Sequence, residues 1–381
     1  MMPIPIDYEV LRVLWWFLLG VLLIGFAITD GFDLGILTLL PIIGKTDEER
    51  RIMLNTIGPV WEGNQVWFIL GGGAIFAAWP MIYAVSFSGF YLAMLVVLLA
   101  LILRPVGFKY RSKVKSPTWR TTWDILLFIG GVVPALIFGV ALGNVLQGVP
   151  FQLDTSLRIF YTGTFWQLLN PFAIGCGLVS VFMLTMHGGV YLACKTEGPL
   201  RARAARASEI AALIYVVLFV GIGYFITHLD GYMFAQPVVH DGVSNPLNKK
   251  VIVEAGAWLT NFALYPWLWS LPILAVVSAL LTVVTVAVRS KWAFIPSSIV
   301  QFTTIATLGV SMFPFILPSS SNPSMSLTVW DASSSQTTLF IMLIATVIFM
   351  PIILLYTSWV YRILRGKITA DFLKEQGDSA Y

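Results

Sequence analysis

The chain has 381 residues, of which 58% are hydrophobic and only 11% charged, and its formal net charge is +4. Its mean hydropathy is +0.84, whereas soluble domains carry about 25% charged residues. A soluble protein this apolar would lack the polar residues needed to cover its surface. Lipid must therefore face much of the chain, and the length is best read as a number of membrane spans of about 20 residues each.

The positive net charge does not indicate a nucleic-acid-binding protein. Lys and Arg lie in short loops between apolar stretches rather than in one basic stripe. This distribution is typical of the positive-inside pattern of membrane proteins. We expect lipid, not nucleic acid, as the surrounding partner.

Nine apolar segments follow one another along the chain, and we expect each to be a transmembrane helix because an open sheet cannot satisfy its backbone in lipid. They cover residues 11–43, 65–80, 83–103, 125–146, 165–192, 210–227, 258–288, 292–316 and 339–361. The sequence thus predicts an all-α integral membrane protein with one polytopic domain over 1–381.

The basic residues predict the orientation of these nine spans. Alternate loops on one side hold Lys45, Arg50, Arg51, Arg104, Lys109, Arg111, Lys113, Lys115, Arg120, Lys195, Arg201, Arg203, Arg206, Arg289, Lys291, Arg362, Arg365, Lys367 and Lys374. The other side holds only Arg12, Arg158, Lys249 and Lys250. The larger set is expected in the cytoplasm, which puts the N-terminus outside and the C-terminus inside.

The first segment is longer than a bilayer requires. A helix over 11–43 would be about 50 Å long, so it either tilts, projects into the cytoplasm or breaks near Asp30 and Gly31. The residues before it are few and acidic, without a basic region, so we expect an uncleaved first span rather than a removable signal peptide.

Asp30 and Asp33 are the most informative polar residues of the first segment. They are three positions apart and therefore share one helix face, toward the cytoplasmic end of the span. Ionisable residues inside a membrane usually face the protein interior and mark proton or ion paths. Two interpretations stay open: a proton-carrying or structural network, or a pair of carboxylates at the water interface.

A second polar cluster opens the second segment, where Glu62 lies among apolar and amide groups between Trp61 and Trp67. The tryptophans are typical of the membrane interface, but Glu62 is a candidate for proton transfer. Arg104, at the end of the third segment, is a candidate counter-charge for Glu62 or Asp30. A third cluster, at 143–151, contains Asn144 and Gln147, which share a helix face and are expected to hydrogen-bond a neighbouring helix.

Histidine and cysteine are scarce. Of His187, His228 and His240, only His187 lies within a span, so a bis-histidine heme site inside the bundle is not expected. Cys176 and Cys194 would be about 27 Å apart on one helix, too far for a disulfide. We find no phosphate-binding loop, dinucleotide fingerprint or nucleophile elbow, and we expect no catalytic residue and no metal site in this chain.

An ordered set of motifs then resembles subunit II of bacterial cytochrome bd ubiquinol oxidases. The motifs include Thr29-Asp-Gly-Phe-Asp33, Trp61-Glu-Gly-Asn-Gln-Val-Trp67, Arg104-Pro, Gly143-Asn-Val-Leu-Gln-Gly-Val-Pro150, Trp330-Asp-Ala-Ser-Ser-Ser-Gln336 and Pro351-Ile-Ile-Leu-Leu-Tyr-Thr357. Each motif alone is weak evidence, whereas the set extends in order from the first span to the last.

The resemblance implies two four-helix bundles plus one peripheral helix. It also implies a partner, subunit I, that holds two hemes b, heme d and the quinol-oxidising loop, together with one or more single-span subunits. The complex would oxidise quinol and reduce dioxygen to water in the bacterial inner membrane, without pumping protons. This heme-free subunit would scaffold subunit I, and a quinone can be held in it as a structural lipid.

The resemblance further implies that Asp30, Asp33 and Glu62 contribute to a cytoplasmic proton-uptake path. Relatives carry Asp at the position of Glu62 in some cases, so this chain has the longer acid there. Two alternatives remain: a secondary transporter, for which the run of three glycines at 71–73 would be a helix break, and a heme-binding cytochrome b.

Overall fold

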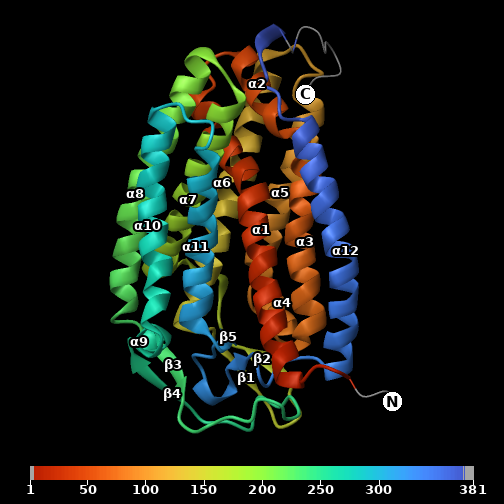
Figure 1. Cartoon of the computed structure of the whole chain (residues 1–381), viewed down its shortest axis with the longest axis vertical. Coiled ribbons are helices and arrows are strands. Elements are labelled where there is room, and N and C mark those ends of the chain that lie inside the picture. The colour runs from red at the N-terminus through yellow and green to blue at the C-terminus, as the bar shows by residue number, and fades with distance from the viewer. Residues whose placement is uncertain (1–3, 372, 374–381) are drawn as a thin grey trace.

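The computed structural model describes residues 4–371 and 373, and it is an elongated bundle of long helices (Figure 1). In the described part of the chain α1, α3, α5 and α6 pack together, α7, α8, α10 and α11 form a second group, and α12 lies against α1 and α3 at the edge. This agrees with two four-helix bundles plus one peripheral helix. Contacts of α1 and α6 with α7 join the two bundles.

The helices have the following bounds. They are α1 (Tyr8–Ile43), α2 (Asp47–Ile57), α3 (Trp61–Ala78), α4 (Pro80–Gly89), α5 (Tyr91–Tyr110), α6 (Pro117–Gln147), α7 (Pro171–Lys195), α8 (Gly198–Ile226), α9 (Thr260–Leu264), α10 (Ser270–Ala287), α11 (Phe294–Met312) and α12 (Gln336–Ile363).

Eight helical stretches of the described chain are long and apolar enough to cross a membrane: α1, α5, α6, α7, α8, α10 with the turn before it, α11 and α12. The remaining predicted span, 65–80, is the 18-residue helix α3. Its first turns carry Glu62, Asn64 and Gln65, which lower its hydropathy, yet it lies alongside the other long helices in Figure 1.

The first span is one continuous helix of 36 residues. It does not break at Asp30 and Gly31, because its inner surface is held against neighbouring helices along its whole second half. Gly35 approaches α7 so closely that a Cβ on it would lie 2.0 Å from the carbonyl oxygen of Leu184. Small residues permit this kind of backbone approach in membrane helices, and here it locks α1 to α7.

Several predicted boundaries were wrong for identifiable reasons. The segment 83–103 is two helices, α4 and α5, which meet at Phe90. The segment 258–288 is interrupted before Pro266, whose ring disrupts a helix. Helix α8 begins twelve residues before the predicted 210, because Arg and Glu side chains extend a helix into water without raising its hydropathy.

In the described residues, six short strands form three antiparallel hairpins that the hydropathy pattern did not predict. They are β1 (Phe151–Leu153) with β2 (Ile159–Tyr161), β3 (Asp230–Phe234) with β4 (Val251–Ala255), and β5 (Phe315–Leu317) with β6 (Leu327–Thr328). All three lie at the lower end of the bundle in Figure 1, which we call the strand end.

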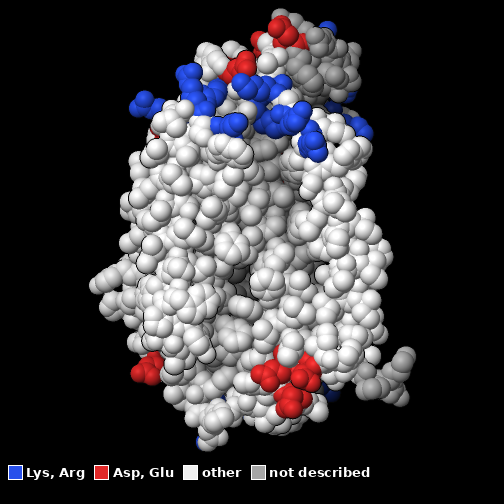
Figure 2. All heavy atoms as spheres, in the orientation of Figure 1, with Lys and Arg blue, Asp and Glu red and all other residues white. Residues whose placement is uncertain are grey.

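The opposite end, which we call the basic end, carries α2 and most of the visible Lys and Arg side chains (Figure 2). Helix α1 begins at the strand end and α12 ends at the basic end (Figure 1). On the face shown in Figure 2, the basic residues are segregated as the loops predicted, although Arg104 lies buried within α5 rather than in a loop, and Lys374 lies outside the described residues. Cys176 and Cys194 lie on one helix, α7, and both are free thiols.

Candidate functional site

A buried ion pair joins α1 to α5 in the half of the bundle nearer the basic end. Arg104 donates from Nη1 to Asp30 Oδ2 at 2.9 Å and from Nη2 to Asp30 Oδ1 at 2.5 Å. Both side chains are 0% exposed. This two-point geometry is the strong form of an Arg–carboxylate interaction. Of the two counter-charge partners considered for Arg104, the structure pairs it with Asp30.

Asp33 lies one helical turn further along α1 and is also 0% exposed. Its Oδ2 accepts a hydrogen bond from Asn64 Nδ2 at 2.9 Å and is 3.8 Å from Arg104 Nη2. Its Oδ1 is buried and receives no hydrogen bond from the described residues. Both acids therefore face the protein interior, and the interpretation of Asp30 and Asp33 as interface carboxylates is wrong.

The charges of Asp30, Asp33 and Arg104 do not balance when all three side chains are ionised. Two carboxylates face one guanidinium, so the cluster is short of one positive charge when both acids are ionised. An uncompensated charge in a buried site is costly, and like-charged carboxylates that share a site cannot easily ionise together. The arrangement can hold one exchangeable proton, and the oxygen without a donor, Asp33 Oδ1, is where that proton fits.

Aromatic side chains close the cluster from the second bundle and from α12. Phe32, between the two acids in sequence, stacks on Tyr191 of α7 with ring centroids 3.9 Å apart. Tyr361 of α12 packs edge-on to Phe32 and donates its hydroxyl to Asn64 Oδ1 at 2.5 Å. These rings keep solvent from the acids and connect three helices around them.

Glu62 does not join this cluster. Its side chain is exposed, whereas Asn64 is 2% exposed and contacts Asp33. Residues two positions apart on a helix point about 200° apart, so Glu62 faces outward where Asn64 faces inward. On the same outward surface of α3, Val66, Ile69 and Phe76 are exposed hydrophobic residues. Glu62 is thus an acid beside an apolar surface.

The histidines do not fit a heme-ligating arrangement. His187 is buried, and its two ring nitrogens are each 2.9 Å from a partner, the Ile28 carbonyl oxygen and Ser297 Oγ. His228 bonds to Thr227, and His240 bonds to Glu9 and stacks on Trp330. Axial ligation needs a ring nitrogen free to face iron, which the bonded nitrogens of His187 do not offer.

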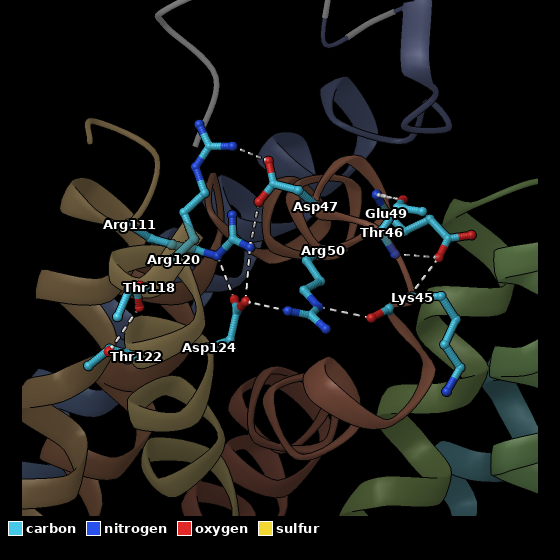
Figure 3. A network of polar contacts seen from close by, with 11 residues as sticks. Lys45, Thr46, Asp47, Glu49, Arg50, Arg111, Thr118, Arg120, Thr122 and Asp124 are labelled. Carbon is cyan, nitrogen blue, oxygen red and sulfur yellow. Dashed lines mark hydrogen bonds and ion pairs between the residues drawn. The ribbon is translucent and has the colours of Figure 1, made fainter. Parts of the chain in front are cut away.

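A second charged network, missed by the sequence reasoning, fastens the loops at the basic end (Figure 3). Asp124 of α6 bonds to Arg111 Nε at 2.5 Å and to Arg50 Nη1 at 2.8 Å. Asp47 bonds to Arg111 at 2.9 Å and to Arg120 at 2.7 Å. The sequence signal for this network was a lone acid, Asp124, at the start of an apolar span that follows a basic loop.

The polar cluster at 143–151 packs the strand end. Asn144 Nδ2 donates to the Leu168 carbonyl at 2.8 Å, and Asn144 Oδ1 accepts from Asn170 at 3.1 Å. Asn170 in turn caps α7 by accepting from Ala173 N. The expected hydrogen bonds are present for Asn144, whereas the Gln147 side chain makes none among the described residues, and Gly148 turns the chain with φ at +84°.

The fold and the buried acids define a polytopic helical membrane protein with ionisable residues inside the bundle, an arrangement that marks proton or ion paths. The family model for cytochrome bd terminal oxidase subunit II matches residues 11–364. The chain therefore belongs to the cytochrome bd oxidase subunit II family, as its motifs suggested.

Individual relatives agree with this assignment. The chain is 52% identical to the cytochrome bd-I ubiquinol oxidase subunit 2 of Escherichia coli strain K12, over 99% of this chain and 100% of that one. It is 29% identical to the cytochrome bd ubiquinol oxidase subunit 2 of Bacillus subtilis strain 168, over 94% and 97%. The bd oxidase structure from Geobacillus thermodenitrificans matches with a TM-score of 0.68 at 14% identity, over 93% and 98%, and it supports the fold.

The family membership has direct consequences. The chain is a subunit of a cytochrome bd ubiquinol oxidase, a quinol:oxygen oxidoreductase, and it is a multi-pass protein of the inner membrane. The complex contains hemes, and this subunit assembles with a subunit I. The transporter and free-standing cytochrome b alternatives are thereby set aside.

Proposed function

We propose that this chain scaffolds subunit I and supplies it with protons taken from the cytoplasm, through Asp30, Asp33 and Glu62. The observation that carries the proposal is the buried cluster of two carboxylates and one guanidinium, which has room for one exchangeable proton. Dioxygen reduction to water consumes protons, and a buried acid that holds one near the partner is suited to deliver it.

Proton uptake from the cytoplasm requires that the basic end faces the cytoplasm and that the N-terminus lies in the periplasm. Proton uptake from the cytoplasm and release from quinol at the outer face would then separate charge without a pump. The acids of α1 lie nearer the basic end, which gives protons from that side the shorter distance to Asp33.

The hemes are proposed to lie on the partner. Two hemes b and one heme d, together with the quinol-oxidising loop, would be held by subunit I, because His187 uses both ring nitrogens in hydrogen bonds and His228 and His240 are exposed side chains outside the helices. Quinol and dioxygen would bind in the complex rather than in this chain alone. One or more single-span subunits and a structural quinone in this subunit complete the proposed assembly.

Glu62 and the cluster are proposed as separate stations of proton uptake. Asn64 and Glu62 point to opposite sides of α3, so Glu62 would act where that surface meets the partner, while Asp33 acts inside the bundle. This division allows either a series, in which a proton passes both stations, or two parallel routes.

The experiment compares Glu62→Gln, Asp33→Asn and the double variant in the purified complex, with quinol-driven oxygen consumption and charge separation in proteoliposomes as readouts. In a series, each single variant lowers turnover about as far as the double variant does. In parallel routes, the double variant is lower than either single variant. Full turnover and full charge separation in all three variants would refute the proposed function.

The heme placement has its own test. Purification of the tagged chain in mild detergent should bring down a larger subunit whose dithionite-reduced spectrum shows b- and d-type bands. Tagged chain that is stable, colourless and alone would contradict the assignment of the hemes to a subunit I bound here.

A further inference from the structure

Helix α12 lies at the edge of the bundle and is mostly exposed. Among its 28 described residues, Leu339 is the only one buried. Its first turn, at the strand end, is bound to the bundle by two hydrogen bonds. Gln336 donates to the Ile6 carbonyl at 2.8 Å, and Trp15 Nε1 donates to the Leu339 carbonyl at 2.9 Å. Toward the basic end, its side-chain hydrogen bond to the bundle is the one from Tyr361 to Asn64.

That hydrogen bond favours one orientation of the Asn64 amide. A phenol hydroxyl can donate or accept, but Asn64 Oδ1 is the one acceptor that the described residues offer to the Tyr361 hydrogen, so a flipped amide would leave that hydrogen unpaired. The amide nitrogen must then point the other way, and there it donates to Asp33 Oδ2 at 2.9 Å. Without the hydroxyl, the amide oxygen and nitrogen can exchange places, since the two orientations have nearly the same shape.

The orientation matters because the amide nitrogen and the amide oxygen require opposite protonation states of Asp33 Oδ2. An amide nitrogen can only donate, so Oδ2 must stay an acceptor. An amide oxygen can only accept, so in the flipped orientation it would draw the proton of a protonated Asp33 onto Oδ2. In the observed orientation the carboxyl proton is restricted to Oδ1, which faces no donor among the described residues.

We propose that Tyr361, acting through Asn64, is a positioning residue that sets which oxygen of Asp33 carries the exchangeable proton. The proposal rests on the proposed function of Asp33 in proton uptake. It also makes the peripheral helix α12 part of the proton-handling apparatus, since a displacement of α12 would withdraw the hydroxyl and release the amide. Asn64 contacts Asp33, whereas Tyr361 acts only through Asn64.

The variant that isolates this contact is Tyr361→Phe in the assembled complex. It removes the hydroxyl and keeps the ring that packs against Phe32. Tyr356→Phe, on the same helix but with a side chain 62% exposed, is the matched control. We expect Tyr361→Phe to lower quinol oxidase turnover roughly three- to tenfold, the effect of a lost hydrogen bond between two neutral groups, and Tyr356→Phe to leave turnover unchanged.

Infrared difference spectroscopy distinguishes a positioning role from a purely structural one, because a purely structural effect of Tyr361 would not shift the bands of Asp33. The carboxyl or carboxylate bands that disappear in Asp33→Asn are assigned to Asp33. We expect these bands to shift in Tyr361→Phe and in Asn64→Leu, and to stay in place in Tyr356→Phe. In the Asn64→Leu background, Tyr361→Phe should cause no further shift, because its effect passes through the amide.

The two proposals fail in different ways. If Asp33→Asn keeps wild-type turnover, Asp33 is not a station and the proposed function is refuted at that residue. If Asp33→Asn impairs turnover but Tyr361→Phe leaves the Asp33 bands unmoved, the positioning role alone is refuted. A band shift that persists in the Asn64→Leu background would also overturn it, since Tyr361 would then act without Asn64.

Discussion

Arg104 and Asp30 face each other across the interface of α5 and α1, and both side chains are completely buried. The guanidinium reaches both carboxylate oxygens of Asp30 and is also 3.8 Å from Asp33. The arginine therefore compensates one of the two carboxylate charges, and it links α5 to α1.

Removal of this arginine should be strongly destabilising. Arg104→Leu leaves two buried carboxylates without a cation, and a buried charge that loses its partner costs about 3–5 kcal/mol. We expect a lower thermal transition of the purified complex and a reduced yield. The double variant Arg104→Leu with Asp30→Asn should recover part of the loss, because it removes one of the orphaned charges. A single variant as stable as wild type would contradict the ion pair.

The close approach of α1 to α7 gives a second prediction. Gly35→Ala places a methyl group 2.0 Å from the Leu184 carbonyl oxygen, so the two helices must separate. Overpacking of this kind costs about 1–3 kcal/mol, which should appear as a lower thermal transition. Gly20→Ala on the same helix meets no atom within 4 Å and is the control. It should be neutral or slightly stabilising, because Ala is the better helix former. Equal effects of the two variants would argue against the contact.

A third prediction concerns Arg12, a buried arginine at the strand end. Its guanidinium donates to Ser333 Oγ at 2.8 Å, to the Gly242 carbonyl at 2.9 Å and to Ser244 Oγ at 2.9 Å. It therefore ties the loop between β3 and β4 to α1. Arg12→Gln should make this loop more sensitive to protease added from the outer side, and Arg12→Lys should not restore protection, because an ammonium lacks the planar fork of donors.

Arg158 provides the comparison for this experiment. It lies at the same end with an exposed side chain, so Arg158→Gln removes the same charge without untying the loop. Protection of the loop in the Arg12→Gln variant equal to that in the Arg158→Gln variant would show that Arg12 does not restrain it.

The basic end offers a prediction about pH. Burial raises the pKa of Glu49, but hydrogen bonds from Arg203 and from the backbone of Lys45 and Thr46 outweigh it, so the pKa falls below its ordinary 4.5. A carboxylate with a lowered folded-state pKa stabilises the fold above its unfolded pKa, and the contribution is lost as the pH falls through the folded-state pKa.

We therefore expect the thermal stability of the complex to fall below about pH 4.5 partly through Glu49. Glu49→Gln should be less stable at neutral pH, by about 1 kcal/mol or less because the pair with Arg203 is partly exposed. The difference between the variant and wild type should shrink as the pH falls. A difference that is constant across this range would mean that the ionised carboxylate contributes nothing.

The sequence alone determined the membrane character of this protein, the approximate positions of its spans and the segregation of its basic residues. These properties depend on local runs of apolar side chains and on charges in the loops between them. The three-residue spacing of Asp30 and Asp33 also placed them on one helix face, but only the structure showed that this face is buried. Hydropathy predicted the wrong start for α8 and missed the hairpins, because short strands and charged helix ends have no long apolar run.

Only the tertiary structure decided which charges and amides meet. Glu62 and Asn64 are two residues apart, yet one points outward and the other to Asp33, and Arg104 pairs with Asp30 across 74 residues of chain. Tyr361 reaches Asn64 from a helix at the far end of the sequence. Which side chains meet depends on how whole helices pack. Helix packing depends on all the interfaces between the helices, so no local sequence pattern predicts it.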